Sequence, residues 1–210
     1  MIRVFLVDDH AIVRHGLRDI LLAERDIAIA GEAEDGMTAL ASLHKTPADV
    51  VVLDIALPDI SGMELLSRIT ALPDAPRVLI LSMYPETQYA VRTLKAGAAG
   101  YLTKNSAPGE LVTAVRKAAQ GGRYINMALA EHLAASLGME KPVLPHETLS
   151  NREFQVFLRL GQGQSLNEIA GALGLSPKTI STYRTRIMGK MNFKNNAELV
   201  RYAIEHKLIL

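Results

Sequence analysis

The chain begins with "MIRVFLVDDHAIVRHGL", residues 1–17, in which a short apolar run ends in two adjacent aspartates and a helical pattern follows at once. The run at residues 4–7 is apolar at every position, as in strands that are buried on both faces of a sheet. Two neighbouring carboxylates at the end of a buried strand repel each other and are costly to desolvate. Asp9 alone is suited to cap the next helix. The pair therefore either caps that helix or holds a cation.

Four more apolar runs follow within the first 120 residues, and an amphipathic stretch succeeds each of them. We expect strands at residues 4–7, 27–33, 49–54, 77–82 and 98–103, and helices near 11–24, 36–45, 62–71, 85–96 and 108–121. Buried strands that alternate with helices indicate a parallel sheet covered on both faces. The expected fold class is α/β, a flavodoxin-like, doubly wound domain of five βα units. Its sites are expected at the carboxyl ends of the strands.

After residue 122 the alternation of apolar runs and amphipathic stretches ends. The stretch "GMEKPVLPHET", residues 138–148, contains two prolines, and we interpret residues 123–146 as a linker. Residues 147–210 carry helical patterns throughout, which predicts a small all-α domain. Ser150 and Glu153 have the spacing of a capping box and mark the start of its first helix.

The composition is ordinary for a soluble globular protein, with 49% hydrophobic and 21% charged residues and no cysteine. The lack of cysteine excludes disulfides and thiolate metal sites. The apolar runs are too short for a signal peptide or a membrane span, so we expect a cytoplasmic protein outside the membrane. Residues 1–146 contain 14 basic and 17 acidic residues, whereas residues 147–210 contain 9 and 5. The basic last part predicts a polyanionic partner.

Polar side chains stand at the ends of four of the expected strands. Asp8 and Asp9 end the first strand, Asp54 the third and Ser82 the fourth, and Lys104 follows the fifth. Three carboxylates gathered at one sheet edge require a cation. Mg²⁺ suits them because it binds one or two carboxylates, keeps waters and completes its shell with phosphate oxygen. The central Asp54 is the natural nucleophile for an aspartyl phosphate.

Residues 1–122 resemble a response-regulator receiver domain, in "LVDDH", "VVLDIALPDISGMEL", "VLILSMY" and "AGAAGYLTK". The resemblance implies that Asp54 is the phospho-acceptor and that Asp8 and Asp9 are the acidic metal pair. It adds the backbone carbonyl of Ala56 as a metal ligand. Mg²⁺ is the implied cofactor.

The resemblance also implies a switch. Ser82 matches the switch hydroxyl, Tyr101 the switch aromatic and Lys104 the phosphate-binding lysine. Asn105 stands where many receivers carry a proline with a cis peptide bond, so we carry over no cis-bond prediction to this position, since a non-proline cis bond costs about 2.5–4 kcal/mol.

The alternative for this half of the chain is a phosphatase of the haloacid-dehalogenase type, which uses a similar set of residues with Mg²⁺. Such an enzyme needs a second carboxylate two residues after its nucleophile. Here Ile55 and Ala56 follow Asp54, and the acid pair comes at the start of the chain instead of late. We therefore expect a protein that accepts and slowly loses its own phosphoryl group, not a turnover enzyme.

The stretch "IAGALGLSPKTISTYRTRI", residues 169–187, has helix–turn–helix spacing. Gly174 permits the turn, Ser176 caps the second helix and Pro177 falls at its first position. At 100° per residue, Ile180, Ile187 and Met191 lie on one side of that helix and small polar residues lie on the other. The polar side can enter a major groove while cations reach phosphates. The expected DNA-binding residues are Lys178, Thr179, Ser181, Thr182, Tyr183, Thr185, Arg186 and Lys190.

Residues 148–210 resemble the LuxR/FixJ-type DNA-binding domain, in "LSNREFQVF", "NEIAGALGLSPKTISTYRTRI", "KM" and "AELVRYA". Ser181 and Tyr183 stand where family members often have lysine and histidine, and the chain most resembles the BvgA- and UvrY-like branch. The resemblance implies that the last helix pairs two DNA-binding domains, although core packing explains the same pattern equally well. The dimer residues so implied are Leu199, Val200 and Ala203.

Together the two resemblances identify a two-component response regulator of the NarL/FixJ family. They imply a receiver domain at 1–122, a linker at 123–146 and a LuxR-type helix–turn–helix domain at 147–210. The expected partners are a sensor histidine kinase or a small phosphodonor, double-stranded DNA and a second copy of the chain after phosphorylation, with RNA polymerase as a further candidate. The alternative of a different class is a regulator that acts through protein partners and never touches DNA.

Overall fold

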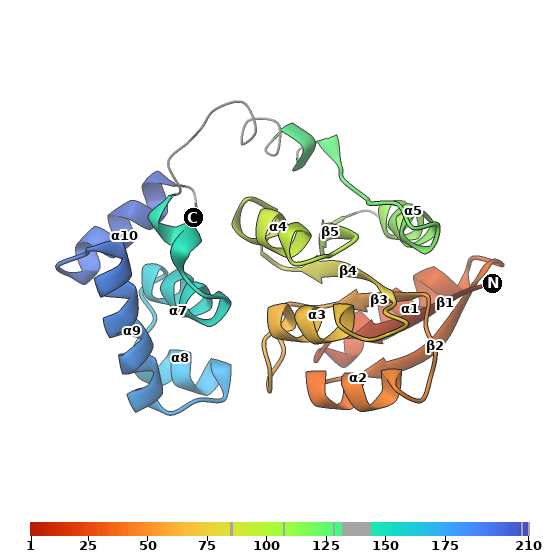
Figure 1. Cartoon of the computed structure of the whole chain (residues 1–210), viewed down its shortest axis with the longest axis horizontal. Coiled ribbons are helices and arrows are strands. Elements are labelled where there is room, and N and C mark those ends of the chain that lie inside the picture. The colour runs from red at the N-terminus through yellow and green to blue at the C-terminus, as the bar shows by residue number, and fades with distance from the viewer. Residues whose placement is uncertain (85, 107, 128, 132–143, 207, 210) are drawn as a thin grey trace. The chain divides into compact units, whose positions relative to one another are not determined.

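A computed structural model describes residues 1–84, 86–106, 108–127, 129–131, 144–206 and 208–209 (Figure 1). The chain divides into two compact units, Met1–Leu133 and Ala134–Leu210. Half of the predicted linker, residues 132–143, lies outside the described residues, and its predicted bounds of 123–146 stay a prediction. None of the described helices is both long and apolar enough to cross a membrane.

The first unit is a five-stranded parallel sheet with the strand order β2-β1-β3-β4-β5. Its strands are β1 (Ile2–Val7), β2 (Ile27–Ala33), β3 (Val50–Leu53), β4 (Arg77–Ser82) and β5 (Gly100–Thr103). Its helices are α1 (Ala11–Leu22), α2 (Gly36–Leu43), α3 (Gly62–Thr70), α4 (Glu86–Lys95) and α5 (Pro108–Ala119). Each of these elements overlaps its predicted range, and the doubly wound α/β class is confirmed.

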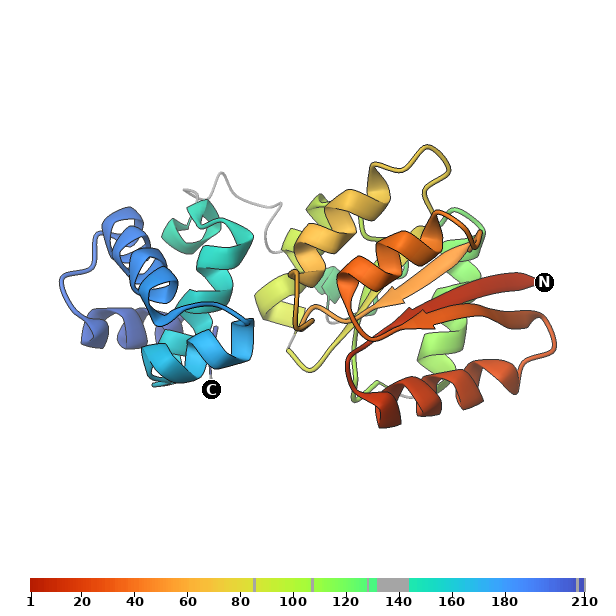
Figure 2. The ribbon, with the colours of Figure 1, turned by 90° about the horizontal axis from the view of Figure 1, so that it is seen from below.

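Helices cover both faces of this sheet, with α1 beside α5 on one face and α2 beside α3 on the other (Figure 1 and Figure 2). The strand β3 lies at the centre and is buried at all its positions, which explains its unbroken apolar sequence. The strand order reverses between β1 and β3, and in open α/β sheets sites form at the carboxyl ends of the strands beside such a reversal. Asp8 and Asp54 follow these two strands directly.

The loop after β3 is fixed by a close backbone approach at Gly62. The Gly62 N–H donates to the carbonyl of Ile55 over 3.0 Å. A Cβ atom at this position would lie 2.4 Å from the carbonyl oxygen of Asp54 and 2.6 Å from the Ile55 Cα. Ser61 caps α3 at the same point, where its Oγ accepts the Glu64 N–H. The start of α3 therefore packs in direct contact with the backbone of Asp54 and Ile55, and only glycine fits at this position.

The second unit is all helical, as predicted. It contains a 3₁₀ helix η1 (Pro145–Thr148), α7 (Asn151–Gly161), α8 (Leu166–Leu173), α9 (Pro177–Met191) and α10 (Asn196–Glu205). The predicted capping box of Ser150 and Glu153 is present, and Ser165 and Glu168 form a second one that sequence reasoning missed. Ser176 caps α9 as predicted.

The turn between α8 and α9 depends on Gly174, whose φ of 62° lies in the left-handed region that glycine enters without strain. The inward side of α9 carries Ile180, Ile187 and Met191, all buried, as the helical wheel predicts. The side chains of Leu199 and Ala203 on α10 have no exposed surface. This burial favours the core-packing alternative for Leu199 and Ala203, and their assignment to a dimer contact stays a prediction.

We expect Gly62→Ala to lower the free energy of unfolding by about 1–3 kcal/mol, the usual range for overpacking, because the new methyl group meets backbone that cannot rotate away. Urea unfolding followed by circular dichroism measures the change. Gly109→Ala in α5 is the matched control, since a Cβ there meets nothing within 4 Å. Equal stability of Gly62→Ala and the unmodified chain would contradict the constraint.

Candidate functional site

The backbone of the strands brings three of the predicted site residues together at one sheet edge. The Asp8 N–H donates to the Ala33 carbonyl of β2 over 3.2 Å, and the Asp54 N–H donates to the Val7 carbonyl of β1 over 2.9 Å. The Lys104 N–H donates to the Ser82 carbonyl of β4 over 2.8 Å. Each side chain is thus held in register by the strand next to it.

Lys104 joins two buried carboxylates. Its Nζ lies 2.6 Å from Asp8 Oδ2 and 2.6 Å from Asp54 Oδ2. The exposed fractions of the three side chains are 7%, 2% and 3%. Burial lowers the pKa of Lys104, but the charges and hydrogen bonds of Asp54 and Asp8 outweigh it and the net shift is upward. The lysine therefore stays charged between its partners.

The environment of Asp54 disfavours its ionised form. Burial raises the pKa of Asp54, and the neighbouring Asp8 carboxylate adds to this effect. Lys104 and the N–H of Ala56, which donates to Asp54 Oδ1 over 3.1 Å, act in the opposite direction without cancelling it. The pKa of Asp54 is consequently above its usual range. The predicted metal contact of the Ala56 carbonyl stays a prediction.

The donor set at this edge fits a divalent cation. One ligand atom each from Asp8, Asp9, His10 and Asp54 lies within 4.8 Å of all the others. Of the described lysine and arginine side chains, Lys104 alone forms an ion pair with any of these three carboxylates, which leaves two negative charges for an ion to balance. Oxygen donors of this kind suit Mg²⁺. Asp9 does not cap α1, because the N-cap residue is His10 and α1 has no side-chain cap. The capping alternative for Asp9 is therefore excluded.

The two predicted switch residues meet at one residue that sequence reasoning missed. Ser82 Oγ accepts the Tyr84 N–H over 3.2 Å, and the Tyr101 hydroxyl donates to the Tyr84 carbonyl over 2.7 Å. Ser82 and Tyr101 are both fully buried. The Tyr84 ring lies 5.1 Å from the Tyr89 ring of α4, measured between centroids. Tyr84 thus links the sheet edge to α4, and its place two residues after Ser82 is the only sequence signal for that role.

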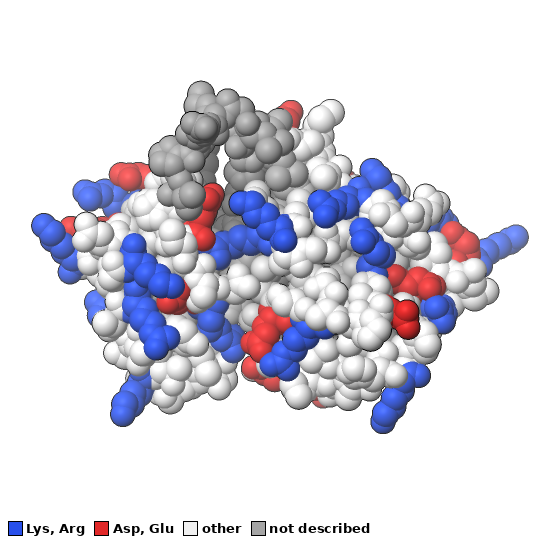
Figure 3. Space-filling view, in the orientation of Figure 1, with Lys and Arg blue, Asp and Glu red and all other residues white. Residues whose placement is uncertain are grey.

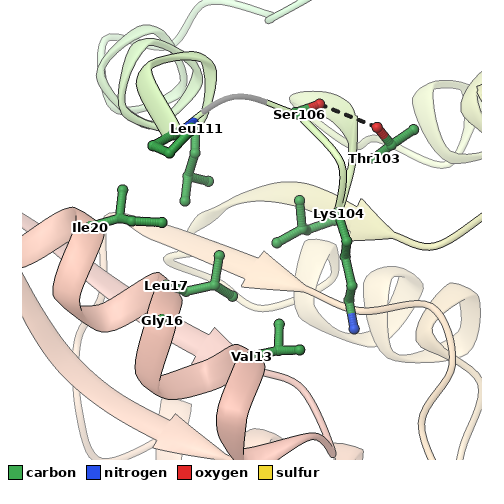
Figure 4. A pocket seen from close by; sticks show the side chains of 10 residues that line it. Val13, Gly16, Leu17, Ile20, Thr103, Lys104, Ser106 and Leu111 are labelled. Atoms are coloured by element: carbon green, nitrogen blue, oxygen red, sulfur yellow. Dashed lines mark hydrogen bonds between the residues drawn. The ribbon is translucent and has the colours of Figure 1, made fainter.

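A groove of about 190 Å³ lies on the other side of Lys104, between α1 and the segment that joins β5 to α5 (Figure 4). Val13 and Leu17 of α1 line it opposite Leu111 of α5. The hydroxyls of Thr103 and Ser106 lie 3.3 Å apart at its rim. The stem of Lys104 forms part of the wall, so this groove borders the carboxylate cluster.

In the second unit, the outward side of α9 carries most of the predicted DNA-binding residues. Lys and Arg side chains gather over this helix (Figure 3). Thr179 and Tyr183 are only partly exposed, whereas the others are exposed. The hydroxyls of Thr182 and Thr185 donate to the carbonyls of Lys178 and Ser181, each over 3.1 Å. The exposed side of α9 is therefore polar, and α9 itself contains no acidic residue.

Lys190 has a structural partner that sequence reasoning did not find. Its Nζ lies 2.6 Å from Glu153 Oε2, and the same oxygen accepts the Ser150 N–H over 2.8 Å. Burial raises the pKa of Glu153, but the hydrogen bonds from Lys190 and Ser150 outweigh it and the pKa is lowered. The pair ties the end of α9 to the start of α7. The predicted phosphate contact of Lys190 stays untested.

Comparison with known proteins identifies both units. Residues 4–116 match the family model of the response regulator receiver domain, and residues 147–203 match that of bacterial regulatory proteins of the luxR family. The chain is 40% identical over 209 residues to the response regulator UvrY of Escherichia coli strain K12, which covers 99% of this chain and 96% of that protein. It is 41% identical over 201 residues to the transcriptional regulatory protein UhpA of the same strain, with coverage of 96% and 97%.

A solved structure agrees with both matches. RcsB from Salmonella enterica serovar Typhimurium, bound to the promoter rprA in the presence of the phosphomimetic BeF3−, superposes with a TM-score of 0.67 at 27% identity. The match covers 96% of this chain and 98% of that chain.

Removal of the Asp54 charge should stabilise the first unit. Because the pKa of Asp54 is raised on folding, the folded protein binds this proton more tightly than the unfolded chain does, so the contribution of Asp54 to stability is lost as the pH rises through its folded pKa. We expect Asp54→Asn, measured without divalent ions, to raise the Tm at pH 7.5 by a few degrees, roughly the effect of 1 kcal/mol. The gain should shrink as the pH falls and the wild-type carboxyl takes up its proton.

The control for this experiment is Asp59→Asn. Burial raises the pKa of Asp59, but the N–H groups of Gly36, Ile60 and Met37 outweigh it and the pKa is lowered. Ionised Asp59 therefore stabilises the fold at neutral pH, and its replacement should lower the Tm. A lower Tm for Asp54→Asn as well would contradict the conclusion that the ionised Asp54 side chain destabilises the fold.

Proposed function

Because the chain belongs to the two-component response regulators that carry a receiver domain and a LuxR-type DNA-binding domain, we propose that it is phosphorylated on Asp54 by a sensor histidine kinase and then binds DNA as a dimer to regulate transcription. This family consists of transcription factors, not of turnover enzymes. The observation that carries the proposal is the bridge of Lys104 between Asp8 and Asp54 beside the carboxylate cluster. A cytoplasmic location follows from this role.

The arrangement supports attack of an Asp54 oxygen on the phosphorus of the donor. The bond from Asp54 to phosphorus forms while the bond from phosphorus to the donor nitrogen, or to the oxygen of a small acyl phosphate, breaks. The Ala56 N–H orients the carboxylate through Oδ1, and Lys104 stands at Oδ2, where it can bind a phosphoryl oxygen. Mg²⁺ bound by Asp8, Asp9 and Asp54 would neutralise phosphoryl charge.

The signal then passes through the switch residues. A phosphoryl group on Asp54 offers oxygens to Lys104 and to the Ser82 hydroxyl. A turn of Ser82 toward that group changes its hydrogen bond with the Tyr84 N–H. The Tyr84 carbonyl also accepts the Tyr101 hydroxyl, and the Tyr84 ring makes a tilted contact with the Tyr89 ring of α4. Phosphorylation thereby biases an existing equilibrium of the surface made by α4, β5 and α5.

For DNA binding, the outward side of α9 fits a major groove. Exposed Ser181, Thr182 and Thr185 lie opposite the buried side of the helix and would meet base edges. Arg186 stands beside them with no side-chain ion pair among the described residues, so it suits a phosphate. The RcsB relative was solved bound to a promoter, which supports this use of the second unit. On α10, half-buried Val200 stays the proposed dimer contact.

Phosphorylation is tested with the purified chain, Mg²⁺ and acetyl phosphate. We expect a phosphoryl group that hydroxylamine removes, stronger binding to genomic DNA fragments in a footprint, and neither result in Asp54→Asn. Asp49→Asn is the control, because Asp49 lies at the opposite end of β3 in an ion pair with Arg3. Full labelling of Asp54→Asn would contradict the site, and labelling without any effect on DNA binding would favour a regulator that acts through protein partners.

Sequence recognition is tested on α9 with specific and scrambled duplexes over a salt series. Thr182→Ala should weaken the preferred site by about 1–3 kcal/mol and leave scrambled DNA unchanged. Arg186→Ala should weaken both duplexes and reduce the salt slope by about one. Lys190→Ala should instead lower the free energy of unfolding by about 1 kcal/mol, because it leaves Glu153 with fewer partners. Equal loss on both duplexes for Thr182→Ala would exclude base recognition by that residue.

A further inference from the structure

His10 lies beside the carboxylate cluster with no assigned role. Its Nδ1 is 2.7 Å from Asp9 Oδ1 and 3.4 Å from Asp8 Oδ1, and 65% of its side chain is exposed. The residue occupies the N-cap of α1, yet its ring makes no capping hydrogen bond. The other α-helices whose N-cap is described, α2, α3 and α7 to α10, begin with an Asp, Ser or Asn side chain that does cap. The imidazole is thus directed to the carboxylates and not to the helix.

The spacing of these atoms is that of ligands around one ion. Bonds of about 2.0–2.2 Å place neighbouring ligand atoms about 3–3.5 Å apart and opposite ones about 4 Å apart. The distances in the cluster run from 2.7 Å to 4.8 Å, so small shifts of exposed Asp9 and His10 would complete such a shell. Lys104, the Ala56 N–H and the His10 N–H, which donates to Asp8 Oδ1 over 2.9 Å, do not prevent this, because a carboxylate accepts at several positions on its two oxygens.

The chemistry of a mixed shell differs from that of the three carboxylates alone. Mg²⁺ prefers oxygen and keeps waters, so an imidazole adds little to its binding. Zn²⁺ binds imidazole nitrogen and carboxylate oxygen well and is usually four-coordinate, and it exceeds earlier first-row ions in affinity for such sites. Asp8, Asp9, His10 and Asp54 supply four ligands.

We propose that His10 Nδ1 is a metal ligand and that the cluster therefore also takes Zn²⁺, in competition with Mg²⁺. A four-coordinate Zn²⁺ would leave no open position for a phosphoryl oxygen and would occupy the carboxylate of Asp54. Zinc then inhibits phosphorylation of this receiver. The inference rests on the proposed function, because it assumes that Asp8, Asp9 and Asp54 form the Mg²⁺ site.

Binding of Zn²⁺ and Mg²⁺ to the full chain is measured by titration calorimetry. We expect His10→Asn to weaken Zn²⁺ binding roughly tenfold to hundredfold, because even the loss of a residue that only hydrogen-bonds to a metal ligand weakens metal binding by this much. Mg²⁺ binding should change less than about threefold. His15→Asn is the matched control on the same helix, because the His15 side chain is exposed and is not part of the cluster of Asp8, Asp9, His10 and Asp54. This change should leave both affinities unchanged. Asp9→Ala should weaken both ions.

The contacting nitrogen is identified separately by long-range ¹H–¹⁵N spectra of the histidine rings during Zn²⁺ titration. We expect the Nδ1 resonance of His10 to shift at one equivalent and Asp54 labelling to fall in parallel. Unchanged Zn²⁺ binding in His10→Asn would overturn the inference alone. Stronger binding of both ions by His10→Asn would also overturn it, because His10 would then compete with the metal ion for Asp9 instead of binding the ion. Unchanged Mg²⁺ binding in Asp9→Ala would overturn the proposed metal site itself.

Discussion

The contact of one lysine with two buried carboxylates holds the first unit's functional edge together. Lys104 arrives from the end of β5, whereas Asp8 and Asp54 arrive from β1 and β3, so the ammonium spans three strands. A buried carboxylate pair without a cation would be costly, and one ammonium balances only part of its charge. The edge is therefore stable enough to form and still charged enough to attract an ion and a phosphoryl donor.

Features that depend on spacing within one element were predictable from the sequence. The strands, the helices, the Ser150 capping box and the opposed sides of α9 all follow from hydrophobic periodicity and local hydrogen bonding. The convergence of Asp8, Asp54 and Lys104 was predictable too, because parallel strands place their carboxyl ends at one edge. Each of these predictions requires only the spacing of residues within an element and the order of the elements along the sequence.

Contacts between distant elements gave no such signal. Lys190 and Glu153 are 37 residues apart, and a helical wheel shows only that Lys190 borders a polar side. The same periodicity fits a core residue and a dimer contact, and only the structure shows that Leu199 and Ala203 are buried within the second unit. Tyr84 acts through its backbone, which no residue type reveals. His10 is a lone histidine without a repeating pattern, and only its distance to Asp9 distinguishes it.

The ion pair of Lys190 with Glu153 has a consequence for how the second unit can change over evolutionary time. It anchors α9 at its far end, and Ile180, Ile187 and Met191 anchor it along its inner side. None of these anchors lies on the side that carries Ser181, Thr182 and Thr185. Substitutions on that outer side therefore need not destabilise the helical bundle. Target preference can diversify among related proteins while the scaffold that presents it is inherited unchanged.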